Sequence, residues 1–207
     1  MPSEQLFEQL KHPNPNLREM AMVDIAETYD EETITRLMGI LGAEDVTYRR
    51  AAVKALGFIG ADSIPPLVDS LLNNDNVTIK ASCAKALAQV ASNHPELTFP
   101  ENGMQGLKLA MNDPNPVVHI ASVMALGVVG SPSLDILFET LKNTENLGLA
   151  VAIINALGSI PDKRSIEVLT ELMEDKSVDS YVKESATSAL SRLEMVLNYQ
   201  KAKPSKS

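Results

Sequence analysis

The stretch AVKALGFIG at residues 52–60 recurs along this chain. Copies stand at 83–91 (CAKALAQVA), 122–130 (SVMALGVVG), 153–161 (IINALGSIP) and 186–194 (ATSALSRLE), and a weaker copy (AMVDIAETY) stands at 21–29. The central apolar residues of the six copies are Ile25, Leu56, Leu87, Leu126, Leu157 and Leu190. Their spacings are 31, 31, 39, 31 and 33 residues. A period of this length, repeated along a chain, is the signature of a repeat architecture.

Each period contains two helical patterns separated by turn-forming residues. A shorter amphipathic stretch comes first, with apolar residues three or four apart, as at Leu134, Leu137, Phe138 and Leu141. The copy quoted above follows, with small residues on both sides of its central apolar residue. Two helices of this size cannot bury their apolar faces alone and must stack on neighbouring pairs. The pattern predicts an all-α protein, a right-handed α-solenoid of about six helix pairs.

The repeat pattern also predicts the domain organisation. Residues 1–197 are expected to form a single solenoid. The one spacing of 39 residues places an insertion at 92–103 (SNHPELTFPENG), between repeats three and four. Residues 198–207 contain three lysines and no acid, and we expect this basic tail to be disordered because it is too polar to pack.

Composition excludes several classes of function. The formal net charge is −9, whereas nucleic-acid binders need clustered positive charge, so no nucleic acid is expected as a partner. Cys83 is the only cysteine, which excludes an internal disulfide and favours a reducing compartment. The sequence shows no signal peptide and no apolar run of membrane-spanning length. These features predict a cytoplasmic protein without membrane insertion.

The segment RRAAVKALGFIG at 49–60 and its copies resemble the short HEAT-like repeat of the phycobilin (phycobilisome) lyase family. The resemblance covers roughly residues 3–194 and implies HEAT-type helix pairs. Members of that family attach or detach open-chain tetrapyrroles on cysteines of phycobiliproteins, and other members have no lyase role. The chain is also similar to small cyanobacterial HEAT proteins that associate with an A-type iron–sulfur carrier. A protein partner, either a phycobiliprotein or such a carrier, is what the resemblance implies.

The residues themselves predict no catalytic site, no metal site and no cofactor. No nucleophile–base pair, phosphate-binding glycine loop or metalloprotease helix is found. One cysteine and three histidines spread over different repeats cannot supply the ligands of a zinc or iron–sulfur site. Cys83 stands in a column of small residues, where a cysteine acts as a small buried hydrophobe.

Seven residues before each central position runs a column of mostly basic side chains. By resemblance to the family, this column joins acids of the turns in a polar ladder that links repeats. The expected members are Arg18, Arg49, Lys80, Lys183, Asp75 and Asp113. His119 replaces the basic residue in repeat four, which leaves open a role in pH sensing or ligand contact.

The segments 116–129 and 147–160 contain no formally charged residue. In HEAT solenoids the second helix of each pair lines the concave surface, so an apolar stretch there is typical of an interaction site. The candidate partner-binding residues are His119, Met124, Val128, Val151 and Asn155. The alternative is that both helices are simply core.

Two functions follow from these observations. The first is a non-catalytic protein-binding scaffold or chaperone-like adaptor that uses the concave second-helix face. The alternative is a subunit of a phycobilin lyase or isomerase, which acts on phycobiliproteins together with a partner chain. Under the first function the protein is not an enzyme.

Overall fold

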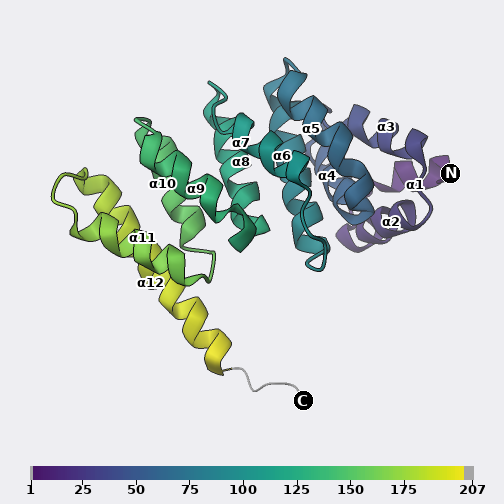
Figure 1. Cartoon of the computed structure of the whole chain (residues 1–207). Helices are drawn as coiled ribbons and strands as arrows, with labels where there is room; N and C mark the ends of the chain where they lie inside the picture. The colour runs from purple at the N-terminus through teal and green to yellow at the C-terminus, as the bar shows by residue number, and fades with distance from the viewer. Residues whose placement is uncertain (1, 203–207) are drawn as a thin grey trace. The chain divides into compact units, whose positions relative to one another are not determined.

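The computed structural model describes residues 2–202, and this part of the chain contains only helices, turns and loops (Figure 1). The helices form six pairs in chain order. These are α1 (Glu4–Gln9) with α2 (Pro15–Glu27), α3 (Glu31–Ile40) with α4 (Val46–Ile59), α5 (Ile64–Asn73) with α6 (Val77–Asn93), α7 (Glu101–Ala110) with α8 (Pro116–Val129), α9 (Leu134–Asn143) with α10 (Leu147–Leu157), and α11 (Lys163–Glu174) with α12 (Ser180–Ala202). The predicted all-α solenoid of helix pairs is confirmed.

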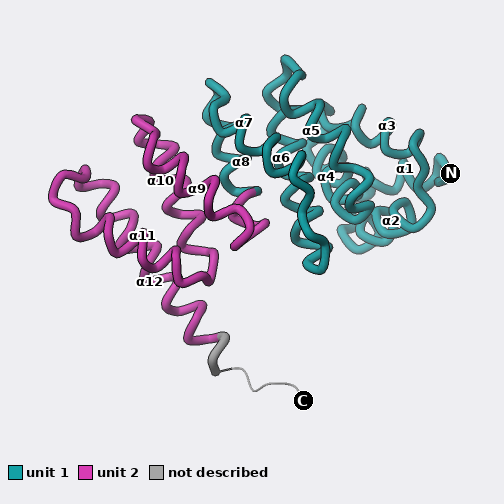
Figure 2. The backbone as a smooth tube through the Cα atoms, viewed as in Figure 1, with its two compact units in different colours: residues 1–125 teal, residues 126–207 magenta. Residues whose placement is uncertain are grey.

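The chain divides into two compact units, coloured separately in Figure 2. Unit 1 spans residues 1–125 and unit 2 spans residues 126–207, so the division falls inside α8. In unit 1 the second helices α2, α4 and α6 pack on one another in sequence, and α5 packs on α7 in the neighbouring layer. In unit 2, α10 and α11 both pack on α12, and α9 packs on α10. Each unit is therefore a two-layered stack.

Every second helix begins after an Asn or Asp placed eleven residues before the central apolar position. Each of these side chains accepts a hydrogen bond from a backbone N–H in the first turn of its helix. The six residues are Asn14, Asp45, Asn76, Asn115, Asn146 and Asp179. Such caps satisfy backbone donors that have no partner inside the helix, which fixes where the helix starts.

The repeat register predicted from the sequence matches the burial of the central residues. Ile25, Leu56, Leu87, Leu126 and Leu157 are fully buried. Leu190 on α12 is only half-buried, and Ala189 and Leu193 are buried in its place. No later helix of the described chain packs on α12, so one side of it stays in solvent.

Glycine is required where second helices approach most closely and where the chain turns sharply. A Cβ on Gly57 of α4 would lie 2.3 Å from the Cβ of Gln89 on α6, so any side chain there would push the helices apart. Gly60 and Gly130 have φ values of 86° and 83°, in the left-handed region that favours glycine. Both lie directly after a second helix, where the chain reverses into the next pair.

The insertion predicted at 92–103 is ordered. Helix α6 runs through to Asn93, residues 94–100 form a loop, and α7 begins at Glu101. Phe99 is buried against Gly103, and the His94 Nε2 lies 3.1 Å from the carbonyl oxygen of Phe58. The loop is therefore fastened to unit 1 at both ends.

The first part of the predicted basic tail is helical. Helix α12 continues to Ala202, so residues 198–202 are helical and not disordered as expected. Extending an existing helix adds a backbone hydrogen bond for each residue ordered, which offsets the low hydrophobicity of this segment. Residues 203–207 lie outside the described residues. Within residues 2–202, no helix combines the length and the apolar character needed to cross a bilayer.

Candidate functional site

Helix α8 exposes apolar side chains to solvent along one side. Val117, Ile120 and Met124 are 52%, 38% and 64% exposed, and their spacing of three and four residues places them on one face of the helix. Val118 and Ala125 on the opposite side are buried. The helix lacks charges throughout, yet the packing of unit 1 covers only one side of it. This exposed apolar face of α8 is therefore the candidate interaction surface.

Positively charged side chains occupy three of the matching positions on the two preceding second helices. Counting from the central apolar residue, Met124 corresponds to Lys54 on α4 and Lys85 on α6, and Ile120 corresponds to Arg50 on α4. All three cations are exposed. We call this surface the open face of unit 1. Its residues are Arg50, Lys54, Lys85, Val117, Ile120 and Met124.

The five residues predicted to bind a partner lie on two helices, His119, Met124 and Val128 on α8 and Val151 and Asn155 on α10. Met124 belongs to the open face of unit 1. Val128, Val151 and Asn155 belong to unit 2, where Val128 and Asn155 are exposed and Val151 is half-buried. The Asn155 Oδ1 accepts a hydrogen bond of 2.8 Å from Arg192 on α12. Met124, Val128 and Asn155 are therefore not core residues.

His119 requires a correction. It is 6% exposed and its Nδ1 lies 3.2 Å from the backbone carbonyl of Asp113, six residues earlier. Only five residues separate it from Met124, but it points into the packed side of α8. His119 therefore binds the turn that precedes its own helix and cannot take part in the exposed surface.

Two of the predicted ladder residues, Arg18 and Arg49, make the same kind of contact with a preceding turn. Arg18 donates hydrogen bonds to the carbonyls of His12 and Pro13, and Arg49 donates to the carbonyl of Ala43. These residues bind the turn before their own helix, not the acids of neighbouring turns.

Lys80 is the ladder residue that joins two repeats. Its Nζ forms an ion pair with Asp113, in the turn before α8, and the two side chains are only 17% and 9% exposed. Asp75 is exposed. Lys183 is half-buried on α12, where its charge adds a small contribution to the lowered pKa of Asp175, after the larger effect of the Ser177 hydrogen bonds.

Opposing effects act on the Asp113 carboxyl. Burial favours its neutral form and would raise its pKa, but the hydrogen bond from Lys80, together with a backbone N–H from Asn115, outweighs burial. The pKa of Asp113 is therefore lower than its ordinary value. Because the carboxylate is charged at neutral pH, the ion pair holds the start of α6 to the turn before α8.

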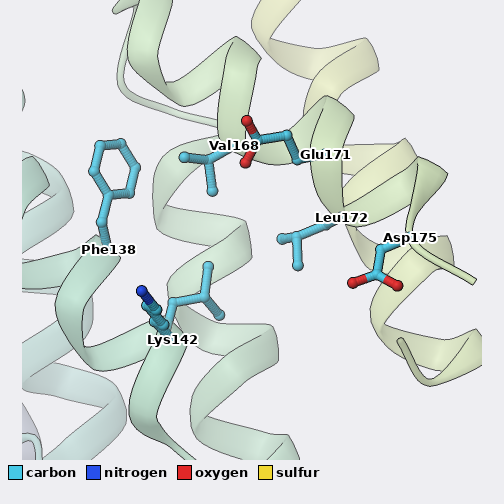
Figure 3. A pocket seen from close by; sticks show the side chains of 7 residues that line it. Phe138, Lys142, Val168, Glu171, Leu172 and Asp175 are labelled. Atoms are coloured by element: carbon cyan, nitrogen blue, oxygen red, sulfur yellow. The ribbon is translucent and has the colours of Figure 1, made fainter. Parts of the chain in front are cut away.

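Unit 2 carries a groove that the sequence analysis did not foresee (Figure 3). It lies between the first helices α9 and α11 and has a volume of about 310 Å³. Apolar side chains from both helices line it, with charged groups around them. The lining residues are Phe138, Leu141, Lys142, Val168, Glu171, Leu172 and Asp175.

Side-chain size accounts for this groove. In unit 1, Val68 of α5 meets Gly106 of α7 so closely that a Cβ on the glycine would lie 2.7 Å from the valine. At the equivalent positions of unit 2, counted from the buried leucines of these helices, stand Phe138 and Val168. Larger side chains facing each other hold α9 and α11 apart. The signal was present in the sequence, but only a first-helix alignment would have shown it.

Cys83 is fully buried in α6. Burial raises the pKa of its thiol to about 11, against a smaller opposite effect from a hydrogen bond with Ser70. Because the thiolate is the reactive form, this cysteine is a poor nucleophile in the folded protein. Among residues 2–202, no group of three His, Cys, Asp or Glu side chains is arranged to hold a metal ion.

Comparison with known proteins places these features in a family. A model of HEAT repeats matches residues 3–88 and 104–191. An uncharacterized phycocyanin operon protein Z of Pseudanabaena tenuis is 56% identical over 201 residues, which cover 97% of this chain and all of that protein. The bilin biosynthesis protein CpeZ of Synechococcus sp. is 34% identical over 178 residues, covering 83% and 95% of the two chains.

The chain belongs to the phycobilin lyase-related HEAT-repeat proteins. Neither of these relatives is named for an iron–sulfur carrier, so the iron–sulfur partner finds no support. A solved structure of importin beta aligns with 92% of this HEAT-repeat protein and 30% of its own chain, with a TM-score of 0.52 and 17% identity. That likeness concerns the solenoid fold alone.

Proposed function

We propose that this protein is a non-catalytic adaptor that holds a protein partner of phycobiliprotein maturation on the open face of unit 1. The observation that carries the proposal is the exposure of Val117, Ile120 and Met124 on a helix without charges. The repeat pattern does not require apolar side chains at Met124 or Ile120, because Lys54 and Lys85 match Met124 and Arg50 of α4 matches Ile120. Covering them with a partner removes apolar area from water at about 25 cal/mol per Å².

The relatives suggest which partner to test. One is named for the phycocyanin operon and the other for bilin biosynthesis. Recombinant apo-phycocyanin, as separate α and β subunits, is therefore the probe of choice. We expect one of the subunits to bind, because an adaptor for chromophore attachment has to recognise the protein before the pigment is in place.

Met124→Lys tests the surface. The column already contains Lys54 and Lys85, so the fold accepts a long charged side chain there, and the melting temperature should stay within a few degrees of wild type. Binding of the apo-subunit should weaken by about 1–3 kcal/mol, the scale of burying an unpaired polar group. Isothermal titration calorimetry measures the change.

Met195→Lys is the matched control. Met195 on α12 is 65% exposed, close to the exposure of Met124, but it lies in unit 2. This variant should bind the apo-subunit as wild type does. Equal loss in both variants, or no loss in Met124→Lys, would remove the open face of unit 1 as the binding surface.

A second candidate function is a subunit of a bilin lyase or isomerase, which the name of the 34% identical relative favours. In that case the chain needs a partner subunit to assemble an active site, and Cys83 cannot carry the pigment because it is fully buried. The test is co-expression with phycocyanobilin and an apo-phycobiliprotein, with and without further candidate subunits. Visible absorbance on the phycobiliprotein that depends on this chain supports the lyase function; pigment attachment at the same rate without it opposes that function.

A further inference from the structure

We propose that the open face of unit 1 recognises an acidic, amphipathic segment of the partner protein, with acids on Arg50, Lys54 and Lys85 and apolar side chains on α8. This inference rests on the proposed function and names the chemistry of the partner. The chain has a net charge of −9, yet α4 and α6 expose three cations on one surface. Lys54 and Lys85 stand two residues before their central leucines, and Arg50 stands one helical turn before Lys54.

The fold does not require these cations. The Lys54 and Lys85 column also holds Val23, Met124, Asn155 and Ser188, so any side chain that tolerates water fits there. Within residues 2–202, the described ion pairs of unit 1 engage other residues, such as Lys11 with Glu8, Arg36 with Glu4 and Lys80 with Asp113. Arg50, Lys54 and Lys85 thus keep their charge available for a ligand.

A groove lies beside the cations. It is formed between α2 and α4 and has a volume of about 320 Å³, with Met22 and Ala51 at its apolar base and Arg50 and Lys54 along one wall. Glu19 faces them from α2. The groove offers a place for an extended or helical segment to pass between the two helices while its acids reach the cations.

The apolar end of the surface is next along the same columns. Helix α4 packs on α6, and the Lys80–Asp113 ion pair ties the start of α6 to the turn before α8. A segment that crosses these helices meets cations first and then Ile120 and Met124. The segment therefore needs both kinds of side chain, acids opposite Arg50, Lys54 and Lys85 and apolar side chains opposite α8.

A nucleic acid fits this surface less well. Three cations neutralise few phosphates, the neighbouring side chains are apolar, and the remaining charge of the chain repels a polyanion. A second copy of this acidic chain is the other candidate ligand for the open face of unit 1, and the experiment below includes a test for it.

The experiment is a triple charge reversal, Arg50→Glu with Lys54→Glu and Lys85→Glu, assayed against the apo-phycocyanin subunit that binds wild type. The control is Lys142→Glu with Lys163→Glu and Lys176→Glu, three exposed lysines of unit 2 that change the net charge by the same amount. We expect the first variant to bind at least about tenfold more weakly and to lose the salt dependence of the association rate, since exposed charges act mainly on that rate. The control should lose less than about threefold.

The outcomes separate this inference from the proposed function. If the subunit binds and Met124→Lys weakens binding while the charge reversal does not, the adaptor function stands and the acidic segment is wrong. Equal losses in both triple variants would mean that net charge alone acts, and would also overturn it. If no subunit binds wild type, the proposed function fails with that probe. Peptides then test the inference: an acidic Leu/Glu helix should bind and its Leu/Lys counterpart should not.

Two further controls complete the test. Tighter binding of a single-stranded 20-nucleotide DNA than of the acidic helix would overturn the inference in favour of a nucleic-acid surface. Analytical ultracentrifugation compares wild type with the charge-reversal variant. If both sediment alike, a second copy of this chain is excluded as the ligand of the open face. A dimer that only the charge reversal abolishes would assign the face to self-association instead.

Discussion

At the scale of single residues, the ion pair between Lys80 and Asp113 joins two consecutive helix pairs of unit 1. Both side chains are mostly buried, so if one partner is removed, water cannot readily take its place beside the other. Lys80→Met leaves the Asp113 carboxylate without its main partner. We expect this change to lower the free energy of unfolding at pH 7 by about 1.5–3 kcal/mol, the scale of a hydrogen bond to a charged group.

The effect should depend on pH in one direction. The pKa of Asp113 is lowered by folding, so the stability it contributes is present above its ordinary pKa and disappears as the pH falls through its lower, folded value. Urea unfolding at pH 7 and at pH 3 should therefore show wild type and Lys80→Met converging in acid. Lys85→Met, an exposed lysine of the same helix, is the control and should unfold as wild type does at both values. A difference that persists undiminished in acid would show that the methionine disturbs packing instead.

At the scale of helices, close approach between second helices depends on glycine. A Cβ on Gly158, at the end of α10, would lie 2.8 Å from the Ala189 Cβ and 2.9 Å from its backbone oxygen on α12. Backbone atoms cannot turn away as a flexible side chain does, so the two helices must separate. Gly158→Ala should cost about 1–3 kcal/mol of the free energy of unfolding, the usual scale for overpacking.

Gly39 supplies the matched substitution. It lies within α3, and a Cβ there would meet no atom within 4 Å. Gly39→Ala should stabilise the protein, by up to about 1 kcal/mol, because alanine loses less backbone entropy in a helix. Thermal and chemical unfolding of the two variants should thus move in opposite directions. Stabilisation by Gly158→Ala would contradict the close packing of α10 on α12.

At the scale of the whole molecule, the place of a repeat in the array decides what a position tolerates. The residue before the central apolar one is a fully buried alanine at Ala55 and Ala86, but in the first pair it is Asp24, which is exposed. No earlier second helix of the described chain packs on α2, so this column reaches water there. The end of an array commonly presents polar groups for this reason.

Exchanging the two residue types checks this rule. Asp24→Ala should change the free energy of unfolding by less than about 0.5 kcal/mol, as surface substitutions usually do. Ala86→Asp places a carboxylate between packed helices and should cost on the order of 3–5 kcal/mol, or unfold unit 1 outright. Circular dichroism during urea unfolding measures both. A large loss in Asp24→Ala would show that the first pair is packed as tightly as the third.

The amino-acid sequence by itself determined the repeat period, the helix pairs and the buried central residues of the first five pairs. These depend on local patterns, namely apolar side chains at helical spacing, caps such as Asp45 and Asn76, and glycines where helices end or touch. It also determined the net charge. The structure identified the Asn/Asp caps, which recur at a constant distance from each central residue.

Only the tertiary structure decided which of these side chains meet solvent and which meet each other. His119 and Met124 lie five residues apart on one uncharged helix, yet His119 is buried against a turn carbonyl and Met124 is exposed to solvent. The ladder residues Arg18 and Arg49 likewise choose backbone carbonyls over acids, and Phe138 opposite Val168 opens a groove. Exposure and partner choice depend on the distance and volume of neighbouring helices, and a periodic pattern along one chain does not contain those quantities.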